Sequence, residues 1–242
     1  IAIRRTEHIK NDDPDATVST FLFTNTLNDF FGDGIRSLNV SSNVQVWAKW
    51  QRKILIQHSA WEYEFGQKVP WDTLSDKILS LKLDTMYDHL IIDEGQDFSV
   101  SDLKVMSLIS ENITVFADEN QRLRDSGIST IKELKDYLNI DNEDTYHLKE
   151  NHRNTLEIIR AAVSLAPDEI DVNLEEVKRS GPKPSIISHK NAEDEIKYIA
   201  RVIRSNAKSA RDVGIFHLER KVITDIYYRL KEELGEDIEI EL

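Results

Sequence analysis

The sequence predicts an α/β fold in which parallel sheets are flanked by helices. From residue 84 onward, short apolar segments alternate with longer segments of helical periodicity. Such alternation is typical of βαβ units, whose strands pair in parallel. A chain of 242 residues with 40% hydrophobic residues is long enough for two modest domains. Because the pattern changes near residue 148, we expect a first domain over 1–147 and a second, partial one over 148–242.

The first domain is expected to begin with a helix over 1–10 and to continue with a strand over 18–24 and a short helix through Phe31. Gly32-Asp33-Gly34 has the composition of a turn. Residues 35–83 contain all four tryptophans and predict a mostly helical insertion with its own small core. The remaining expected elements are strands at 88–93 and 113–117 and helices starting near Val100, where Ser99 and Asp102 have the spacing of a capping box, and near Ser129.

The second domain is expected to start with a strand near 144–148 and a helix over about 154–165. A Ser-Gly-Pro-Lys-Pro segment then predicts a break in regular structure. Further strands are expected at 185–188, 212–216 and 238–242, with helices at 192–206 and 219–234.

Composition excludes several classes of protein. The net charge of −13 argues against a strongly basic nucleic-acid-binding surface, so any polyanion requires a local patch. The sequence has no cysteine and therefore no disulfide or thiolate metal site. It also lacks an apolar run of about 18 residues. We expect a cytoplasmic protein that acts as a monomer and does not enter a membrane. The first residue is Ile1 rather than Met, so we expect a fragment or a processed chain.

The most informative segment is LIIDEGQDF, residues 90–98. Three apolar residues predict the end of a buried strand, and Asp93 and Glu94 follow where that strand would emerge. A carboxylate pair at the end of a strand suits a Mg²⁺ ion and the activation of a water molecule. An acidic turn after a core strand is the alternative interpretation of this pair taken alone. Gln96 and Asp97 are polar residues that a simple strand ending does not require.

Two further segments favour the catalytic interpretation. Asp118 also follows an apolar strand, and Gln121 lies three residues later. Because the carboxyl ends of parallel strands face one crevice, we expect both residues to lie near Asp93 and Glu94. Arg153 opens the expected second domain. An arginine that reaches a phosphoryl-transfer site from a neighbouring domain stabilises charge in the transition state.

Four blocks in this order resemble the UvrD-like branch of superfamily 1 DNA and RNA helicases, motor proteins built from paired RecA-like domains. They are FLFTNTL at 21–27, DEGQDF at 93–98, ADENQ at 117–121 and LKENHRNT at 148–155. The resemblance spans most of the chain except 32–83. It implies P-loop NTPase architecture, ATP and Mg²⁺ as cofactors, and single-stranded DNA or RNA as the partner.

The resemblance also implies roles for individual residues. Asp93 would bind Mg²⁺, directly or through water, and Glu94 would be the general base. Gln121 would lie near the γ-phosphate, and Arg153 would be the arginine finger. Gln96, Asp97 and Asp118 would couple the nucleotide site to the strand-binding cleft. Thr24 and Asn25 would contact the nucleic-acid strand, although capping of the following helix is an equal alternative.

The sequence also departs from the family. None of the eight glycines is followed by Lys, so the phosphate loop G-x-x-x-x-G-K-[ST] is absent. Residues 1–5 resemble the helix that follows this loop. We therefore expect a helicase fragment that does not hydrolyse ATP by itself. Residues 122–125 (RLRD) replace an aromatic residue that stacks on a base, and His152 replaces a tyrosine, which predicts a packing role.

Three alternatives remain open from the sequence. The first is a non-catalytic module that binds nucleic acid or protein. The second is a metal-dependent nuclease that uses four carboxylates around two ions, namely Asp93, Glu94, Asp97 and Asp118. The third concerns the tryptophans, which either stack on bases or, as we favour, fill a core.

Overall fold

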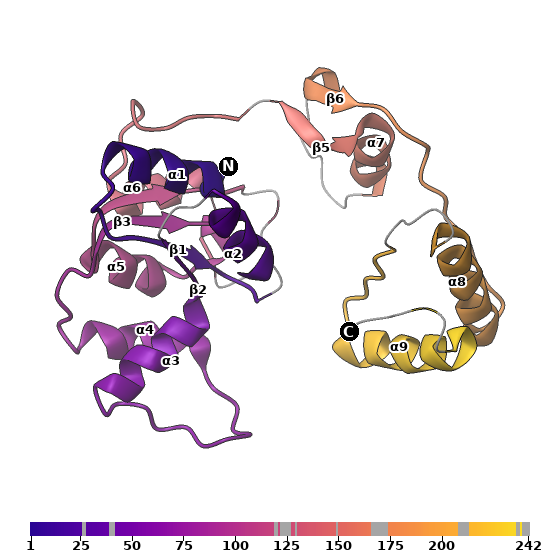
Figure 1. Cartoon of the computed structure of the whole chain (residues 1–242), viewed down its shortest axis with the longest axis horizontal. Helices are drawn as coiled ribbons and strands as arrows, with labels where there is room; N and C mark the ends of the chain where they lie inside the picture. The colour runs from indigo at the N-terminus through magenta and orange to yellow at the C-terminus, as the bar shows by residue number, and fades with distance from the viewer. Residues whose placement is uncertain are drawn as a thin grey trace. The chain divides into compact units, whose positions relative to one another are not determined.

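The computed structural model describes residues 1–25, 28–38, 42–118, 121, 127–128, 130–148, 150–165, 174–207, 213–235 and 238. The chain divides into two compact units, Ile1–Lys149 and Glu150–Leu242 (Figure 1). The division lies two residues beyond the position expected from the sequence. The expected helix start at Ser129 and the RLRD segment at 122–125 lie outside the described residues.

The first unit is built on a four-stranded sheet in which every neighbouring pair of strands is parallel. Its order is β2-β1-β3-β4. The strands are β1 (Val18–Leu22), β2 (Asn43–Val46), β3 (Tyr87–Ile92) and β4 (Ser110–Val115). Phe21 pairs with Ile92, and Ile92 pairs with Val115, so three strands end in register. The predicted α/β class with a parallel sheet is confirmed.

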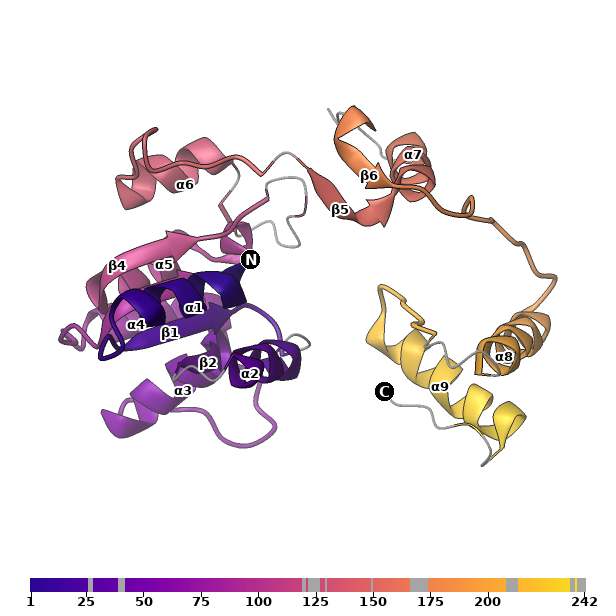
Figure 2. The same cartoon turned by 45° about the horizontal axis from the view of Figure 1, so that its top comes forward.

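Helices cover both faces of this sheet, as expected when the strands are parallel (Figure 2). On one face, α1 (Ala2–Asp12) and α2 (Asn28–Ser37) pack against Val18, Leu22 and Ile91. The other face carries Phe21, Leu90 and Ile92. Four helices contribute to the core on that side: α3 (Trp47–Gln57), α4 (Trp71–Leu79), α5 (Val100–Leu108) and α6 (Ile131–Leu138).

The prediction of a separate core in residues 35–83 was wrong. Trp47 and Trp50 are stacked with ring centroids 4.8 Å apart, and their rings lie 5.0 and 5.5 Å from that of Phe21 in β1. They are only 4% and 2% exposed. The segment also supplies β2, a strand of the main sheet. Residues 35–83 therefore extend the main core, and these two rings are not available to stack on bases.

Asp102 joins three helices beneath this face. Its carboxylate accepts hydrogen bonds from Trp47 Nε1 in α3 (2.7 Å) and from Ser75 Oγ in α4 (2.5 Å). The other carboxylate oxygen accepts from the backbone N–H of Ser99 (3.0 Å), and Ser99 Oγ in turn accepts from the backbone N–H of Asp102 (3.2 Å). This reciprocal pair is the predicted capping box at the start of α5. Asp102 is 6% exposed, and the hydrogen bonds of its carboxylate hold α3, α4 and α5 in place.

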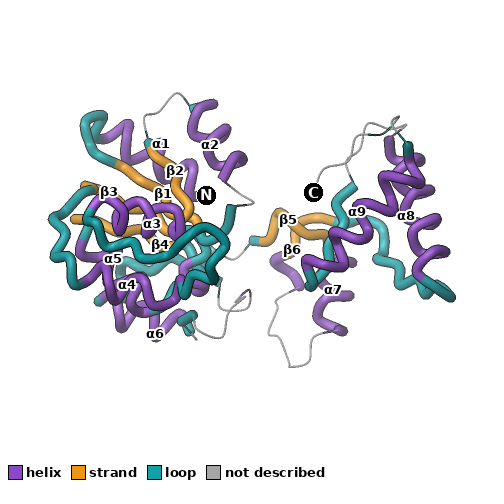
Figure 3. The backbone as a smooth tube through the Cα atoms, turned by 90° about the horizontal axis from the view of Figure 1, so that it is seen from below, coloured by secondary structure: helices purple, strands orange, loops and turns teal. Residues whose placement is uncertain are grey.

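The second unit contains a short parallel pair, β5 (Asn151–Thr155) and β6 (Val177–Arg179), beside α7 (Leu156–Leu165) (Figure 3). The 3₁₀ helix η3 (Leu174–Glu176) precedes β6. The helices α8 (Ala192–Ala207) and α9 (Arg220–Leu234) share a small core, whose buried residues are Ile196, Ala200, Ile203, Leu230 and Leu234.

The helices of the second unit fit the sequence-based expectation better than the strands do. Residues 145–148, 185–188 and 213–216 form no strand, and β5 lies where the α7 helix was expected to begin. Of the strand expected at 238–242, only Ile238 is described. Across the described parts of both units, no helix combines the length and the apolar character needed to cross a membrane.

Candidate functional site at the carboxyl edge of the sheet

A pocket of about 190 Å³ opens where β1, β3 and β4 end. Five of its lining residues were singled out from the sequence, and they come from three separate segments. Thr24 follows β1, Asp93, Glu94 and Asp97 follow β3, and Gln121 follows β4. The parallel arrangement explains this gathering, because the strands end at a common edge. Leu22 and Phe23 complete the lining.

The chain turns sharply at Glu94. Asp93 still belongs to the sheet, because its backbone N–H donates to the Phe21 carbonyl (3.1 Å). Glu94 has φ 56° and ψ 49°, the left-handed conformation, and the short 3₁₀ helix η1 (Gly95–Asp97) follows. This backbone conformation costs a residue with a side chain about 1–2 kcal/mol. Strain of this kind is common where a functional side chain must point in one direction.

Gln96 connects the ends of β3 and β4. Its side chain is 2% exposed, and both of its polar atoms are used. Nε2 donates to Glu94 Oε2 (2.8 Å), and Oε1 accepts from the backbone N–H of Asp118 (3.0 Å). Gln121 Nε2 in turn donates to Asp118 Oδ2 (2.6 Å). Glu94, Gln96, Asp118 and Gln121 therefore form one continuous hydrogen-bonded series.

Two glycines allow this close packing. A Cβ at Gly95 would lie 2.3 Å from Val115 Cγ1 in β4, and a Cβ at Gly127 would lie 2.3 Å from the Gln96 carbonyl oxygen. Real Cβ atoms do not approach so closely, so any larger residue must push the segments apart. The Gly95 N–H also donates to the Phe116 carbonyl (2.8 Å). The η1 segment is thus pressed against the end of β4 by its backbone as well as by its side chains.

The lining of the pocket is acidic. It contains the carboxylates of Asp93, Glu94 and Asp97 and, among the described residues, no Lys or Arg. Carboxylate and hydroxyl oxygens are the ligands that Mg²⁺ prefers, and the ion retains several waters when few protein ligands are present. The described residues contain no group of three His, Cys, Asp or Glu side chains arranged to hold a metal by themselves. The donor set therefore fits a Mg²⁺ ion bound by one or two carboxylates together with water and phosphate oxygens.

The volume limits what the pocket can accept. Sites for whole small molecules usually measure about 300–1,000 Å³. At about 190 Å³ this pocket has room for one phosphate group, an ion and water rather than for an entire nucleotide.

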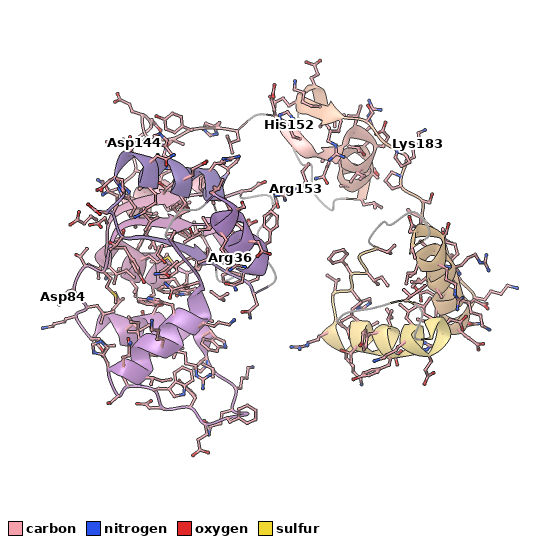
Figure 4. The ribbon with its side chains drawn as sticks, viewed as in Figure 1. Arg36, Asp84, Asp144, His152, Arg153 and Lys183 are labelled. Atoms are coloured by element: carbon pink, nitrogen blue, oxygen red, sulfur yellow. The ribbon has the colours of Figure 1, made fainter. Side chains whose placement is uncertain are left out.

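Four of the predicted site residues lie outside the pocket lining. Gln96 and Asp118 support it through the hydrogen bonds above, whereas Asn25 is exposed and does not line it. Arg153 belongs to the second unit, where Figure 4 labels it with His152 on β5. Its carbonyl accepts a hydrogen bond from Arg179 Nη1 (2.8 Å).

The prediction of a packing role for His152 was wrong. Its side chain is 67% exposed and lies 3.0 Å from Glu150 Oε2. Hydrogen bonds from His152 and then Lys178 lower the pKa of Glu150 below its usual range. His152 is therefore part of a surface charge cluster on β5.

Sequence reasoning missed Leu22, Phe23 and the packing roles of Gly95 and Gly127. Phe23 packs edge-on against Phe98, with ring centroids 5.3 Å apart. Its position next to Thr24 in the FLFTNTL block was a usable signal. The close approach of Gly127 to Gln96 could not be predicted from the sequence, because it depends on the tertiary fold.

Comparison with known proteins adds no relative. No family model matches the chain, and no curated protein matches it.

Proposed function

We propose that these residues belong to an ATP-dependent helicase or translocase resembling the UvrD-like branch of superfamily 1, with the first unit as a RecA-like domain. The observation that carries the proposal is the pocket itself. It brings together Asp93, Glu94 and Gln121, which come from two separate sequence blocks, at the edge of the sheet where parallel α/β folds commonly bind ligands. In this proposal the motor couples ATP hydrolysis to movement along single-stranded DNA or RNA.

Each pocket residue has a chemical task in this proposal. The Glu94 carboxylate accepts a proton from the attacking water, and its orientation is held by Gln96. The Gln121 amide orients that water without adding negative charge. Asp93 holds Mg²⁺ directly or through water. Bound ATP would supply the phosphoryl group, and its Mg²⁺ ion would offset part of the negative charge of the phosphates and of this acidic pocket.

Three further residues of the chain have roles in this proposal. Thr24 and Asn25 are the proposed contacts for the nucleic-acid strand, and Arg153 is the proposed arginine finger. The 242 residues contain no phosphate loop. The lysine and backbone amides with which a phosphate loop grips the remaining phosphates are therefore not among these residues.

A non-catalytic module that binds nucleic acid or protein is the second candidate. It is favoured by the absence of the phosphate loop and of any cation among the described lining residues. The nuclease alternative is weaker. Asp93, Glu94, Asp97 and Asp118 are all described, and they form no metal-holding group.

The test is the ATPase activity of the complete natural gene product, measured with and without single-stranded DNA or RNA. We expect strand-stimulated hydrolysis that falls by about 10²–10⁴-fold on Glu94→Gln. Glu111→Gln is the matched control, since Glu111 is an exposed residue of β4. The 242-residue chain alone should show no turnover. Strand binding without any hydrolysis in the complete protein would support the non-catalytic module instead.

A further inference from the structure

Gln96 is a buried polar side chain between two segments of the first unit. It is 2% exposed at the junction of η1 and the end of β4. Burying an amide is unfavourable unless its donor and acceptor are both satisfied. Here both are satisfied, and by two different segments of the chain. Core filling alone therefore does not explain the choice of glutamine.

Two described residues beyond β4 contact Gln96, Asp118 at its side chain and Gly127 at its backbone. The Asp118 N–H donates to Gln96 Oε1 (3.0 Å). Gly127 packs so tightly on the Gln96 carbonyl that a Cβ would lie 2.3 Å from the oxygen. Gln121 is held to Asp118 by two hydrogen bonds, from its side chain (2.6 Å) and from its backbone N–H (3.1 Å). A change in the position of Asp118 or Gln121 therefore alters the contacts of Gln96.

The same side chain holds the Glu94 carboxylate. Gln96 Nε2 lies 2.8 Å from Glu94 Oε2, and the left-handed backbone at Glu94 brings these neighbours to one side of the turn. A glutamine amide is rigid and planar, so its oxygen and its nitrogen cannot move independently. If Oε1 moves to keep its hydrogen bond with the Asp118 N–H, the Nε2 donor that orients Glu94 therefore moves with it.

We propose that Gln96 is a positioning residue that links the Glu94 carboxylate to Asp118 and, through Asp118, to Gln121. The proposal rests on the proposed function, in which Glu94 activates water and Gln121 orients it. Gln96 does not touch the reacting atoms. Through Gln96, the orientation of the Glu94 carboxylate depends on the position of Asp118 and Gln121. Glu94 and Gln121 are then both in place for hydrolysis, or neither is.

Hydrogen exchange on the 242-residue chain tests the contact independently of any activity. Gln96→Met keeps the length and apolar volume of the side chain but removes both hydrogen bonds. We expect the Asp118 amide to exchange at least about 10-fold faster, since a lost hydrogen bond of about 1.4 kcal/mol or more corresponds to that factor. The Gly95 amide, which donates to Phe116, serves as the internal reference and should stay protected.

Gln51→Met is the matched control. Gln51 is another buried glutamine of the first unit, 1% exposed, and its Nε2 donates to Ser75 Oγ (2.9 Å). The same substitution there removes a buried amide without touching Glu94 or Asp118. It should leave the Asp118 amide as slow as in the wild type. Equal acceleration in both variants would show a general loss of stability and would overturn the proposal.

Gln96→Glu separates the two halves of the contact. It keeps an oxygen for the Asp118 N–H but replaces the donor facing Glu94 by a second oxygen. We expect the Asp118 amide to remain protected, while kcat of the complete protein falls by about 10–100-fold and KM for ATP is unchanged, a range typical of groups that orient a ligand. Gln96→Met should lower kcat similarly.

The outcomes distinguish this proposal from the proposed function. If the complete protein shows no ATPase activity, the proposed function fails and Asp118 exchange alone decides whether the contact exists. If Glu94-dependent ATPase activity is present but Gln96→Met changes neither exchange nor kcat, the positioning role is refuted. If exchange accelerates and kcat does not change, Gln96 is structural only and the proposal is likewise refuted.

Discussion

Replacing Glu94 by glycine should leave the first unit more stable than replacing it by alanine. Both substitutions remove the carboxylate and its hydrogen bond from Gln96, so these losses cancel in the comparison. What remains is the backbone, which is left-handed at this residue (φ 56°, ψ 49°). Glycine adopts that conformation freely, whereas alanine does not.

The size of the difference follows from two opposing terms. The left-handed conformation costs alanine about 1–2 kcal/mol. Glycine loses about 0.4–1 kcal/mol more conformational free energy from the unfolded chain. The net advantage of glycine is therefore about 1 kcal/mol. With a denaturant dependence of about 2 kcal/mol per M, the midpoint of urea unfolding should be about 0.5 M higher for Glu94→Gly.

Tryptophan fluorescence is the appropriate assay, because all four tryptophans belong to the first unit. The control is the same pair of substitutions at Lys104, an exposed residue within α5. There the order should reverse, with glycine about 1 kcal/mol less stable than alanine. If Glu94→Ala is as stable as Glu94→Gly or more so, the strained turn is not present and the geometry argued for the site is incorrect.

Three other predictions concern the same unit and use the same unfolding assay. Thr20 Oγ1 is buried without a hydrogen-bond partner, so Thr20→Val should be neutral or stabilising by up to about 1 kcal/mol, and a loss of stability would contradict this. Asp102→Ala should destabilise the first unit by about 3–5 kcal/mol, because it leaves the buried donors of Trp47 and Ser75 without their acceptor. Trp47→Phe should then reduce the free energy of unfolding less in the Asp102→Ala background than in the wild type. Equal costs in the two backgrounds would refute the proposed coupling. Hydrogen bonds from the Thr17 side chain and backbone lower the pKa of Asp88 below its ordinary value of 3.8. The carboxylate therefore contributes stability above pH 3.8 that is lost as the pH falls through the lower folded-state pKa, and Asp88→Asn should reduce this acid sensitivity, as measured by the urea midpoint against pH.

Three strands of the four-stranded sheet could be predicted, whereas the edge strand β2 could not. β3 ends in the continuous apolar run LII, which is fully buried, and all five residues of β1 are buried although two of them are Ser and Thr. β2 reads Asn-Val-Gln-Val and is an edge strand, where polar residues are tolerated. Its pattern therefore did not distinguish it from the helical residues that follow.

Gly32-Asp33-Gly34 shows why a local rule failed. The two glycines lie inside α2 rather than in a turn. A Cβ at Gly34 would come within 2.5 Å of Ile3 Cδ1, so this glycine allows α1 and α2 to approach closely. The requirement comes from tertiary packing, which the local sequence does not contain.

The polar residues of the site could be predicted from the sequence, but the hydrogen bonds that connect them could not. Parallel strands bring their carboxyl ends together, so the gathering of Asp93, Glu94 and Gln121 followed from the expected sheet, whereas the presence of Thr24 beside them was not predicted. The direction of the Gln96 side chain did not follow. The left-handed turn at Glu94 interrupts the alternation of a strand, and side-chain directions beyond it depend on the fold.

The strand order β2-β1-β3-β4 also determines when the site can form during synthesis. None of these pairs is a hairpin, and the contact of Thr17 with Asp88 spans 71 residues. At a translation rate of about 5–20 residues per second, β1 waits about 4–14 s before its partner β3 leaves the ribosome. During that time the buried face of β1 has no β3 to cover it. Slow codons or a chaperone acting within this interval should therefore affect the yield of folded protein more than they would after residue 118 has emerged.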